Sequence, residues 1–168
     1  DYDYTPTAIY LYVYEKGTEK PLNPTYILNN PDWTNVRYSN AIWKGEALID
    51  EVRLGIYEKN PPNVFTKESF DQKPQGWTFT NAVIDNSKAR LTGTGNSWAT
   101  RLQGPFVSSQ SNPHYSIDFT NLTLDSVLHV MIEGQAQDNT YRRFCIYQGG
   151  GKLNVQVVDK NGWSYPYS

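Results

Sequence analysis

The chain has a single cysteine, no excess of charge of either sign and no long apolar run, and each absence excludes a class of protein. Cys145 has no partner for a disulfide within the chain, so the fold has to rest on its hydrophobic core. The 15 basic and 17 acidic residues give a net charge of −2, which lacks the basic footprint of a protein that binds nucleic acid or an anionic membrane. No apolar stretch approaches the ~18 residues of a membrane span, so we expect no membrane insertion.

Motifs that carry catalysis or bind metals are also missing. The sequence contains no phosphate-binding loop, dinucleotide fingerprint, serine elbow or Cys-x-x-Cys spacing. Two histidines, His114 and His129, are too few for a multi-histidine metal site. His114 follows Pro113 in a predicted turn, where a solvated imidazole is expected. We predict no cofactor and no catalytic metal, and structural calcium at the loops Asp138–Asn139 or Asp159–Asn161 stays open as an alternative.

Aromatic residues, in contrast, are abundant. They make up 14% of the 168 residues, with 13 Tyr and 5 Trp, and such side chains favour half-buried strands and offer flat faces to sugar rings. A chain of this length buries roughly two-thirds of its unfolded surface, which is enough for one core. Asn60–Asn63 is a plausible internal boundary, but the segment before it is short for an independent domain. We therefore predict a single domain over residues 1–168, with a boundary near residues 60–64 as the alternative.

Apolar residues recur with a period of two, which is typical of half-buried β-strands. The clearest alternations have apolar residues at Ile9, Leu11 and Val13, at Tyr115, Ile117 and Phe119, at Leu128, Val130 and Ile132, and at Leu153, Val155 and Val157. Turns rich in Gly, Asn and Pro separate these runs, and no stretch of about 12 residues has helical spacing. Pro21–Asp32 is predicted as a long loop, because its prolines cannot donate to a central ladder. The sequence thus predicts an all-β fold, a two-sheet antiparallel sandwich of the jelly-roll kind.

Two segments resemble strands of concanavalin A-like and laminin G-like sandwich domains. Gly45–Gly55, with the sequence GEALIDEVRLG, resembles the closing strand, in which a glycine precedes an apolar-Asp-Glu-Val-Arg-apolar run. Glu68–Asp71, followed by Trp77 and Ala89–Leu91, resembles the opening strand. The two segments stand in inverted order. The domain would therefore be circularly permuted, completed by strand exchange between molecules, or part of a longer array.

The resemblance leaves function broad, because this fold hosts lectins, adhesion modules, glycosidases and lyases. Glycosidases on it carry closely spaced carboxylates on one strand. Glu46 and Asp50 share a strand face, but their Cα atoms would lie ~13 Å apart at ~3.3 Å per residue, beyond the ~5–9.5 Å between the carboxyl groups of such enzymes. We predict that the chain is not an enzyme, and a glycoside hydrolase or lyase fragment is the third-ranked hypothesis.

A sugar-binding site needs aromatic faces beside planar polar groups that can pair with hydroxyls. If the aliphatic residues of each strand face the core, the opposite face collects such side chains. The predicted ligand-binding residues are Trp98, Arg101, His129, Tyr141, Arg143, Tyr147, Gln156 and Trp163. The first-ranked function is a non-catalytic, lectin-like carbohydrate-binding or adhesion module, extracellular or at the cell surface, with a polysaccharide or other glycan as its partner.

The second-ranked function is a structural repeat or subunit of a surface protein or extracellular filament. Low charge and many Asn, Thr, Tyr and Gly residues suit such a protein. On this hypothesis the tyrosine-rich segment 1–14 is a contact region through which the chain self-associates by strand exchange.

Overall fold

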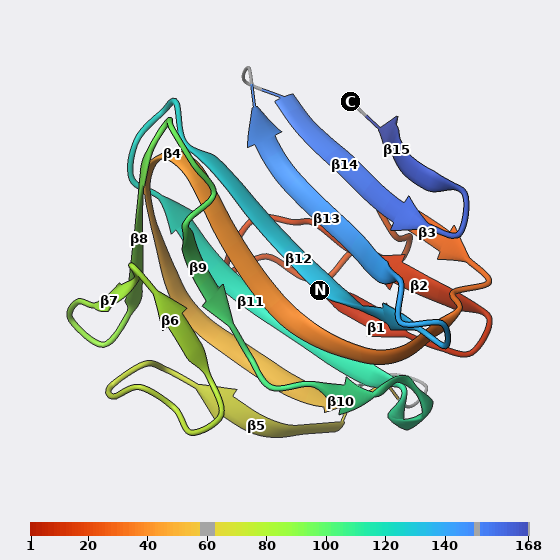
Figure 1. The fold of residues 1–168 in the computed structure, drawn as a ribbon. Coiled ribbons are helices and arrows are strands. Elements are labelled where there is room, and N and C mark those ends of the chain that lie inside the picture. The colour runs from red at the N-terminus through yellow and green to blue at the C-terminus, as the bar shows by residue number, and fades with distance from the viewer. Residues whose placement is uncertain (58–62, 150–151, 168) are drawn as a thin grey trace.

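The computed structural model describes residues 1–57, 63–149 and 152–167, and its antiparallel strands form one curled sheet (Figure 1). The strands are β1 (Tyr2–Tyr4), β2 (Ala8–Leu11), β3 (Tyr26–Asn29), β4 (Trp33–Ile56), β5 (Asn63–Glu68), β6 (Thr78–Thr80), β7 (Val83–Ile84), β8 (Ala89–Thr94), β9 (Thr100–Gln103), β10 (Val107–Ser108), β11 (Pro113–Asn121), β12 (Val127–Ala136), β13 (Tyr141–Gly149), β14 (Lys152–Asp159) and β15 (Gly162–Tyr167). The short 3-10 turn η1 (Ser109–Ser111) is the one helical piece in these residues. The all-β prediction is therefore confirmed. Across the same ranges no helix has the length and apolarity to cross a membrane. Of the candidate boundary near residues 60–64, residues 60–62 lie outside the described residues, and β5 begins at Asn63.

The alternation in the sequence sorts side chains onto two faces of this sheet. In β12, Val130 and Ile132 belong to the main core, whereas the intervening Met131 belongs to a separate small cluster with Cys145 on the other face. The same phase holds in β14, where Val155 and Val157 are core residues. Because successive side chains of a strand point to opposite faces, the polar residues between these positions are collected on the outer face.

The long strand β4 connects the two parts of the sheet. It spans 24 residues, and its first half pairs with β12 while its second half pairs with β11. Its other edge pairs in turn with β10, β9, β8 and β5. The change of partner falls at Gly45, which has a φ of 83° and lies between the last β12 pair and the first β11 pair. Figure 1 shows β4 as the curved ribbon that runs through both parts.

The two parts of the sheet close over one hydrophobic core. Strands β12 to β15 lie on one side of β4, and β11, β1, β2 and β3 continue the sheet from its second half, behind β12 to β14 in Figure 1. Side chains meet between them, since the Tyr2 ring packs edge-on against Phe144 at 5.5 Å and Tyr26 contacts the same ring at 5.7 Å. The Tyr2 hydroxyl also donates a 2.8 Å hydrogen bond to the carbonyl of Val130. These contacts leave the outer face of β12 to β14 on the far side of the core.

The segment predicted as a long loop, Pro21–Asp32, contains strand β3. Its four residues pair with β2, and Leu28 is buried. The prolines do not prevent this, because Pro24 and Pro31 flank the strand and β3 lies at the end of the sheet, where one edge has no ladder to complete. The N-terminal residues are also built into the sheet, since β1 lies between β11 and β2.

The expectation of a solvated imidazole at His114 is wrong. His114 is the second residue of β11, it is 3% exposed, and its Nδ1 contacts the buried Asp3 carboxylate on the neighbouring strand. Lys20 Nζ lies 2.7 Å from another oxygen of Asp3. The sequence pattern marked a turn at Pro113, but the strand begins there, and the partner of His114 lies 111 positions away in the chain.

Candidate functional site

A hollow of about 410 Å³, here called the outer pocket, lies on the outer face of the sheet. Its lining residues come from strands β4, β9, β12, β13, β14 and β15 and from the turn before β9. They are Ala41, Trp98, Arg101, Val127, His129, Arg143, Tyr147, Gln156, Trp163 and Tyr165. The outer pocket therefore brings together every residue of the predicted ligand site except Tyr141.

Strand register explains why these residues meet. Across the sheet, Arg101 of β9 pairs with Ala41 of β4, Ala41 pairs with His129 of β12, and His129 pairs with Tyr147 of β13. Directly paired residues of antiparallel strands point to the same face, with Cβ atoms roughly 4.5–5.5 Å apart. The side chains of this row, which are a cation, a small residue, an imidazole and a phenol, therefore lie on one face of the sheet.

Aromatic rings line one side of the outer pocket. The Trp98 ring lies 4.2 Å from His129, and the His129 ring lies 4.9 Å from Tyr147. The ring of Trp43, which was not among the predicted site residues, packs against the Trp98 ring with 5.4 Å between the ring centroids. Tilted arrangements are favoured between rings, so the three outer-pocket rings pack against one another as a preorganised row, here called the platform, with the buried His129 between Trp98 and Tyr147.

A small apolar cluster lies beneath this platform. It consists of Ala41, Met131 and Cys145, all buried, with Trp98 packed against them. Cys145 is fully buried, and burial raises the pKa of its thiol. The thiol is therefore a neutral packing group under the rings rather than a nucleophile.

His129 is an uncharged imidazole. Only 6% of the residue is exposed, and burial lowers its pKa to about 3, with the positive charge of Arg143 contributing further in the same direction. A neutral ring has one donor and one acceptor nitrogen, which suits it to hydrogen bonding with a hydroxyl. The same low pKa makes it a weak general base.

The buried imidazole makes the stability of the protein depend on pH. The unfolded chain binds a proton at His129 below its ordinary pKa of 6.5, whereas the folded chain does not until the pH approaches 3. Acid therefore favours the unfolded state, and the stability contributed by the neutral ring is complete above pH 6.5 and declines as the pH falls toward 3. Between pH 7 and pH 5 we expect His129 to account for a loss of about 2 kcal/mol.

Urea unfolding at pH 7 and pH 5 measures this loss. The variant His129→Gln removes the titrating ring, so its stability should fall by about 2 kcal/mol less than that of the wild type over the same interval. The other acid-sensitive groups are present in both proteins and cancel in the comparison. An identical pH dependence in the two proteins would show that the imidazole is not buried in its neutral form.

Arg143 is held at the other side of the outer pocket by polar and aromatic neighbours. Its Nε donates to the Tyr141 hydroxyl at 2.8 Å, and one terminal nitrogen donates to Gln156 Oε1 at 2.8 Å. The guanidinium also lies 5.2 Å from the Trp163 ring. Gln156 in turn donates to the Tyr165 hydroxyl at 3.1 Å. Tyr141 thus does not line the pocket but positions the arginine that does.

Glu133, a residue outside the predicted site, anchors this network from within the sheet. It is 2% exposed and accepts hydrogen bonds of 2.8 Å from Tyr141, Gln103 and Arg37. Burial alone would raise the pKa of its carboxyl group, but these donors and the charge of Arg37 outweigh burial and hold the pKa below its usual range. The carboxylate is therefore ionised and fully occupied. Sequence alternation placed Glu133 on the same face as His129, but only the structure supplies its partners.

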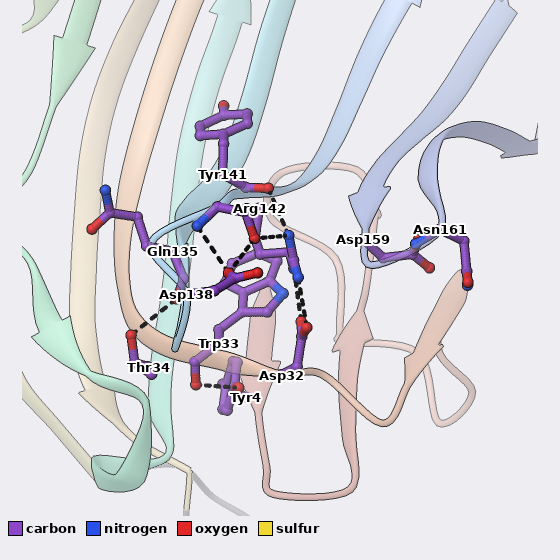
Figure 2. Close-up of polar contacts among 11 residues, drawn as sticks. Tyr4, Asp32, Trp33, Thr34, Gln135, Asp138, Tyr141, Arg142, Asp159 and Asn161 are labelled. Atoms are coloured by element: carbon purple, nitrogen blue, oxygen red, sulfur yellow. Dashed lines mark hydrogen bonds and ion pairs between the residues drawn. The ribbon is translucent and has the colours of Figure 1, made fainter.

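The loops considered for calcium use their carboxylates in other ways. Next to the first loop but outside it, Asp32 forms a two-pronged ion pair with Arg142, with distances of 2.7 and 2.6 Å, and Figure 2 shows this pair beside Asp138. Asp138 accepts from the backbone and hydroxyl of Thr140, and Asp159 accepts from the backbone of Asn161. Among the described residues, no group of three or more His, Cys, Asp or Glu side chains is arranged to hold a metal ion.

The carboxylates considered for catalysis are engaged in ion pairs. Asp50 lies 2.9 Å from both Lys16 and Lys88, and Glu46 lies 3.8 Å from Arg90. Burial works to raise the pKa of Asp50, but its lysine partners hold it below the usual range. Neither group lines the outer pocket.

No family model matches the chain, and neither does any curated protein or solved structure.

Proposed function

We propose that the protein is a non-catalytic carbohydrate-binding or adhesion module of an extracellular or cell-surface protein, with the outer pocket as its binding site. The observation that carries the proposal is the platform of Trp98, His129 and Tyr147 facing the polar pair Arg143 and Gln156 across one pocket. A sugar ring offers an apolar C–H face and a rim of hydroxyls. The platform suits the first, and the amide, guanidinium and imidazole groups suit the second.

The size and rim of the pocket agree with a saccharide ligand. Its volume of about 410 Å³ lies within the ~300–1,000 Å³ common for small-molecule sites. Trp163 and Tyr165, each 59% exposed, stand at the rim on β15. Large apolar rings that are exposed together often mark an interaction site, and the two rings beside this pocket are suited to stacking with a flat ligand.

The chemical groups in the pocket favour a non-catalytic role. No Asp or Glu among the described residues lines it, so these residues offer no carboxyl pair for acid–base catalysis of glycoside hydrolysis. His129, with its pKa near 3, is a poor base at neutral pH. The groups in the outer pocket are suited to hydrogen bonding and stacking.

We further propose that the curled sheet is a two-sheet jelly-roll-like sandwich of the concanavalin A-like or laminin G-like kind. The segment that resembles the closing strand is the second half of β4, and it pairs within the same chain with β5, which leads into the opening-like residues Glu68–Asp71. This pairing favours a permuted domain that closes on itself over completion by a second molecule.

The binding proposal is tested by native-gel affinity electrophoresis against a panel of soluble polysaccharides, namely dextran, galactomannan, xyloglucan, polygalacturonate and alginate. Trp163→Ala removes an exposed ring from the pocket and should weaken retention by about tenfold or more, because aromatic anchors carry much of the energy of such sites. The fold should be unaffected, since the ring is 59% exposed.

The matched control for this experiment is Tyr14→Ala, which removes a partly exposed ring that does not line the outer pocket and should retain wild-type binding. Trp98→Ala provides a second pocket variant. Wild-type retention by both tryptophan variants, or failure of the wild type to bind any glycan, would rule out the proposed site.

A further inference from the structure

The arginines of the chain differ in whether a carboxylate neutralises them. Four have acidic partners: Arg37 lies 2.7 Å from Glu133, Arg90 lies 2.9 Å from Asp85, Arg142 lies 2.6 Å from Asp32, and Arg53 pairs with Glu51. The remaining two are Arg101 and Arg143. No carboxylate among the described residues lies within ion-pair distance of either.

Both unneutralised arginines line the outer pocket. Arg101 is half-buried, and its Nε donates to the backbone carbonyl of Trp98 at 3.2 Å, which fixes the guanidinium beside the platform. Arg143 is half-buried as well, and its hydrogen-bond acceptors are the uncharged Tyr141 and Gln156. The two side chains reach the pocket from opposite ends of the β9–β4–β12–β13 row of strands.

The pocket is therefore positively charged on a protein whose net charge is −2. Within the part of the chain that the structure describes, no acidic residue lines it, and its imidazole is neutral at physiological pH. The carboxylate of Glu133, the cross-strand partner of Arg143, reaches it only through the Tyr141 hydroxyl and pairs directly with Arg37. Each half-buried guanidinium has lost part of its hydration without gaining a direct ion pair, which is unfavourable in the empty site. An anionic ligand group would supply the missing partner, and a planar guanidinium is well matched to the oxygens of a carboxylate or sulfate.

We propose that the outer pocket binds an acidic glycan, in which a sugar ring stacks on the Trp98–His129–Tyr147 platform and its carboxylate or sulfate groups are held by Arg101 and Arg143. The inference rests on the proposed carbohydrate-binding function and names its ligand class. The carboxylate and the sulfate are two sources of the same chemistry, a sugar that carries an oxyanion.

Matched pairs of polysaccharides test the role of the anionic group. Polygalacturonate is compared with its fully methyl-esterified form, which keeps the backbone but lacks the charge, and dextran sulfate is compared with dextran. In native-gel affinity electrophoresis we expect the acidic member of at least one pair to retard the protein and its neutral counterpart to leave migration unchanged. The pair that responds distinguishes a carboxylate from a sulfate. Retention should also decline with added NaCl, since the contact is an ion pair.

Variants show whether the two arginines are responsible. Arg101→Gln and Arg143→Gln should each weaken retention of the acidic member by about tenfold or more, the usual effect of losing a hydrogen bond to a charged group. Arg90→Gln is the control, because Arg90 carries the same charge but lies outside the pocket and is already paired with Asp85. Thermal melts of all variants confirm that they are folded, and Arg101→Gln is expected to be well tolerated because its one polar contact is to a backbone carbonyl.

The outcomes separate this inference from the proposal on which it rests. Equal retention by the acidic and neutral members of both pairs, binding confined to the neutral polysaccharides, or equal losses in Arg90→Gln and the two pocket variants would overturn the acidic-glycan inference while leaving carbohydrate binding intact. Absence of binding to every polysaccharide in both panels would overturn the carbohydrate-binding function and the inference together.

Discussion

Replacing Gly45 by alanine is expected to destabilise the protein by about 3–5 kcal/mol, the sum of backbone strain and overpacking. Gly45 has a φ of 83°, in the left-handed region that other residues adopt at a cost. A Cβ at this position would lie 2.3 Å from Thr123 Oγ1 and 2.8 Å from the Ser126 backbone. The residue marks the point where β4 exchanges β12 for β11 as its neighbour, so a backbone shift here would disturb both parts of the sheet.

Chemical denaturation of the variant measures this loss, with Gly17→Ala as the control. Gly17 has a nearly identical φ of 85°, but no atom lies within 4 Å of the position that a Cβ would take. Its substitution should therefore show the backbone strain alone, about 1 kcal/mol. Equal stability losses in the two variants would mean that the close approach at Gly45 is not a constraint on the fold.

The second large effect is expected at Glu133. The variant Glu133→Gln removes a buried negative charge that pairs with Arg37 and accepts from Tyr141 and Gln103. Breaking a buried pair leaves the other charge uncompensated, so we expect a stability loss of about 3 kcal/mol. Glycan retention should fall as well, because the single oxygen of the amide cannot accept at both carboxylate positions, and the Tyr141 hydroxyl that positions Arg143 loses its charged acceptor.

Urea unfolding and the gel assay measure the two effects on the same variant. Asp125→Asn is the control, since it breaks an exposed pair with Lys44 on the surface and should leave stability and binding unchanged. Loss of stability with full retention of the glycan would show that Glu133 supports the sheet without positioning the outer pocket.

Strand phase explains how much of the site was predictable from the sequence. Once Val130, Val155 and Val157 are assigned to the core, alternation alone sends His129 and Gln156 to the opposite face. Most of the residues that line the outer pocket were predicted in this way. Tyr165, which also lines it, was missed because β15 offers no aliphatic alternation from which to set a phase.

Long-range partners were not predictable. The acceptors and donors around Glu133 come from strands that β4 brings side by side, and Arg37 lies 96 positions away from it. His114 contacts Asp3, which is 111 positions away in the sequence. His114 is therefore buried, whereas the sequence predicted a histidine at the surface. Strand β3 was missed because prolines argue against a central strand but say little about the last strand of a sheet.

The period-two alternation of apolar residues predicted the all-β character of the fold, but the sequence left its closure open. The sequence order of the two family-like segments left permutation and strand exchange both open. In the structure, β1 lies between β2 and β11, and its tyrosines are buried. Exchange through residues 1–14 would therefore require removing an interior strand, which favours the binding-module proposal over the filament hypothesis.

The most direct test of the central claim uses the indole N–H signals of the five tryptophans in a nuclear magnetic resonance titration with a short oligomer of the glycan retained in the gels. Trp98 and Trp163 line the outer pocket, whereas Trp33 and Trp77 are buried in the main core. If the outer pocket is the glycan site, the signals of Trp98 and Trp163 shift on binding and those of Trp33 and Trp77 do not. Saturation of the protein with no change at Trp98 or Trp163 would contradict the account.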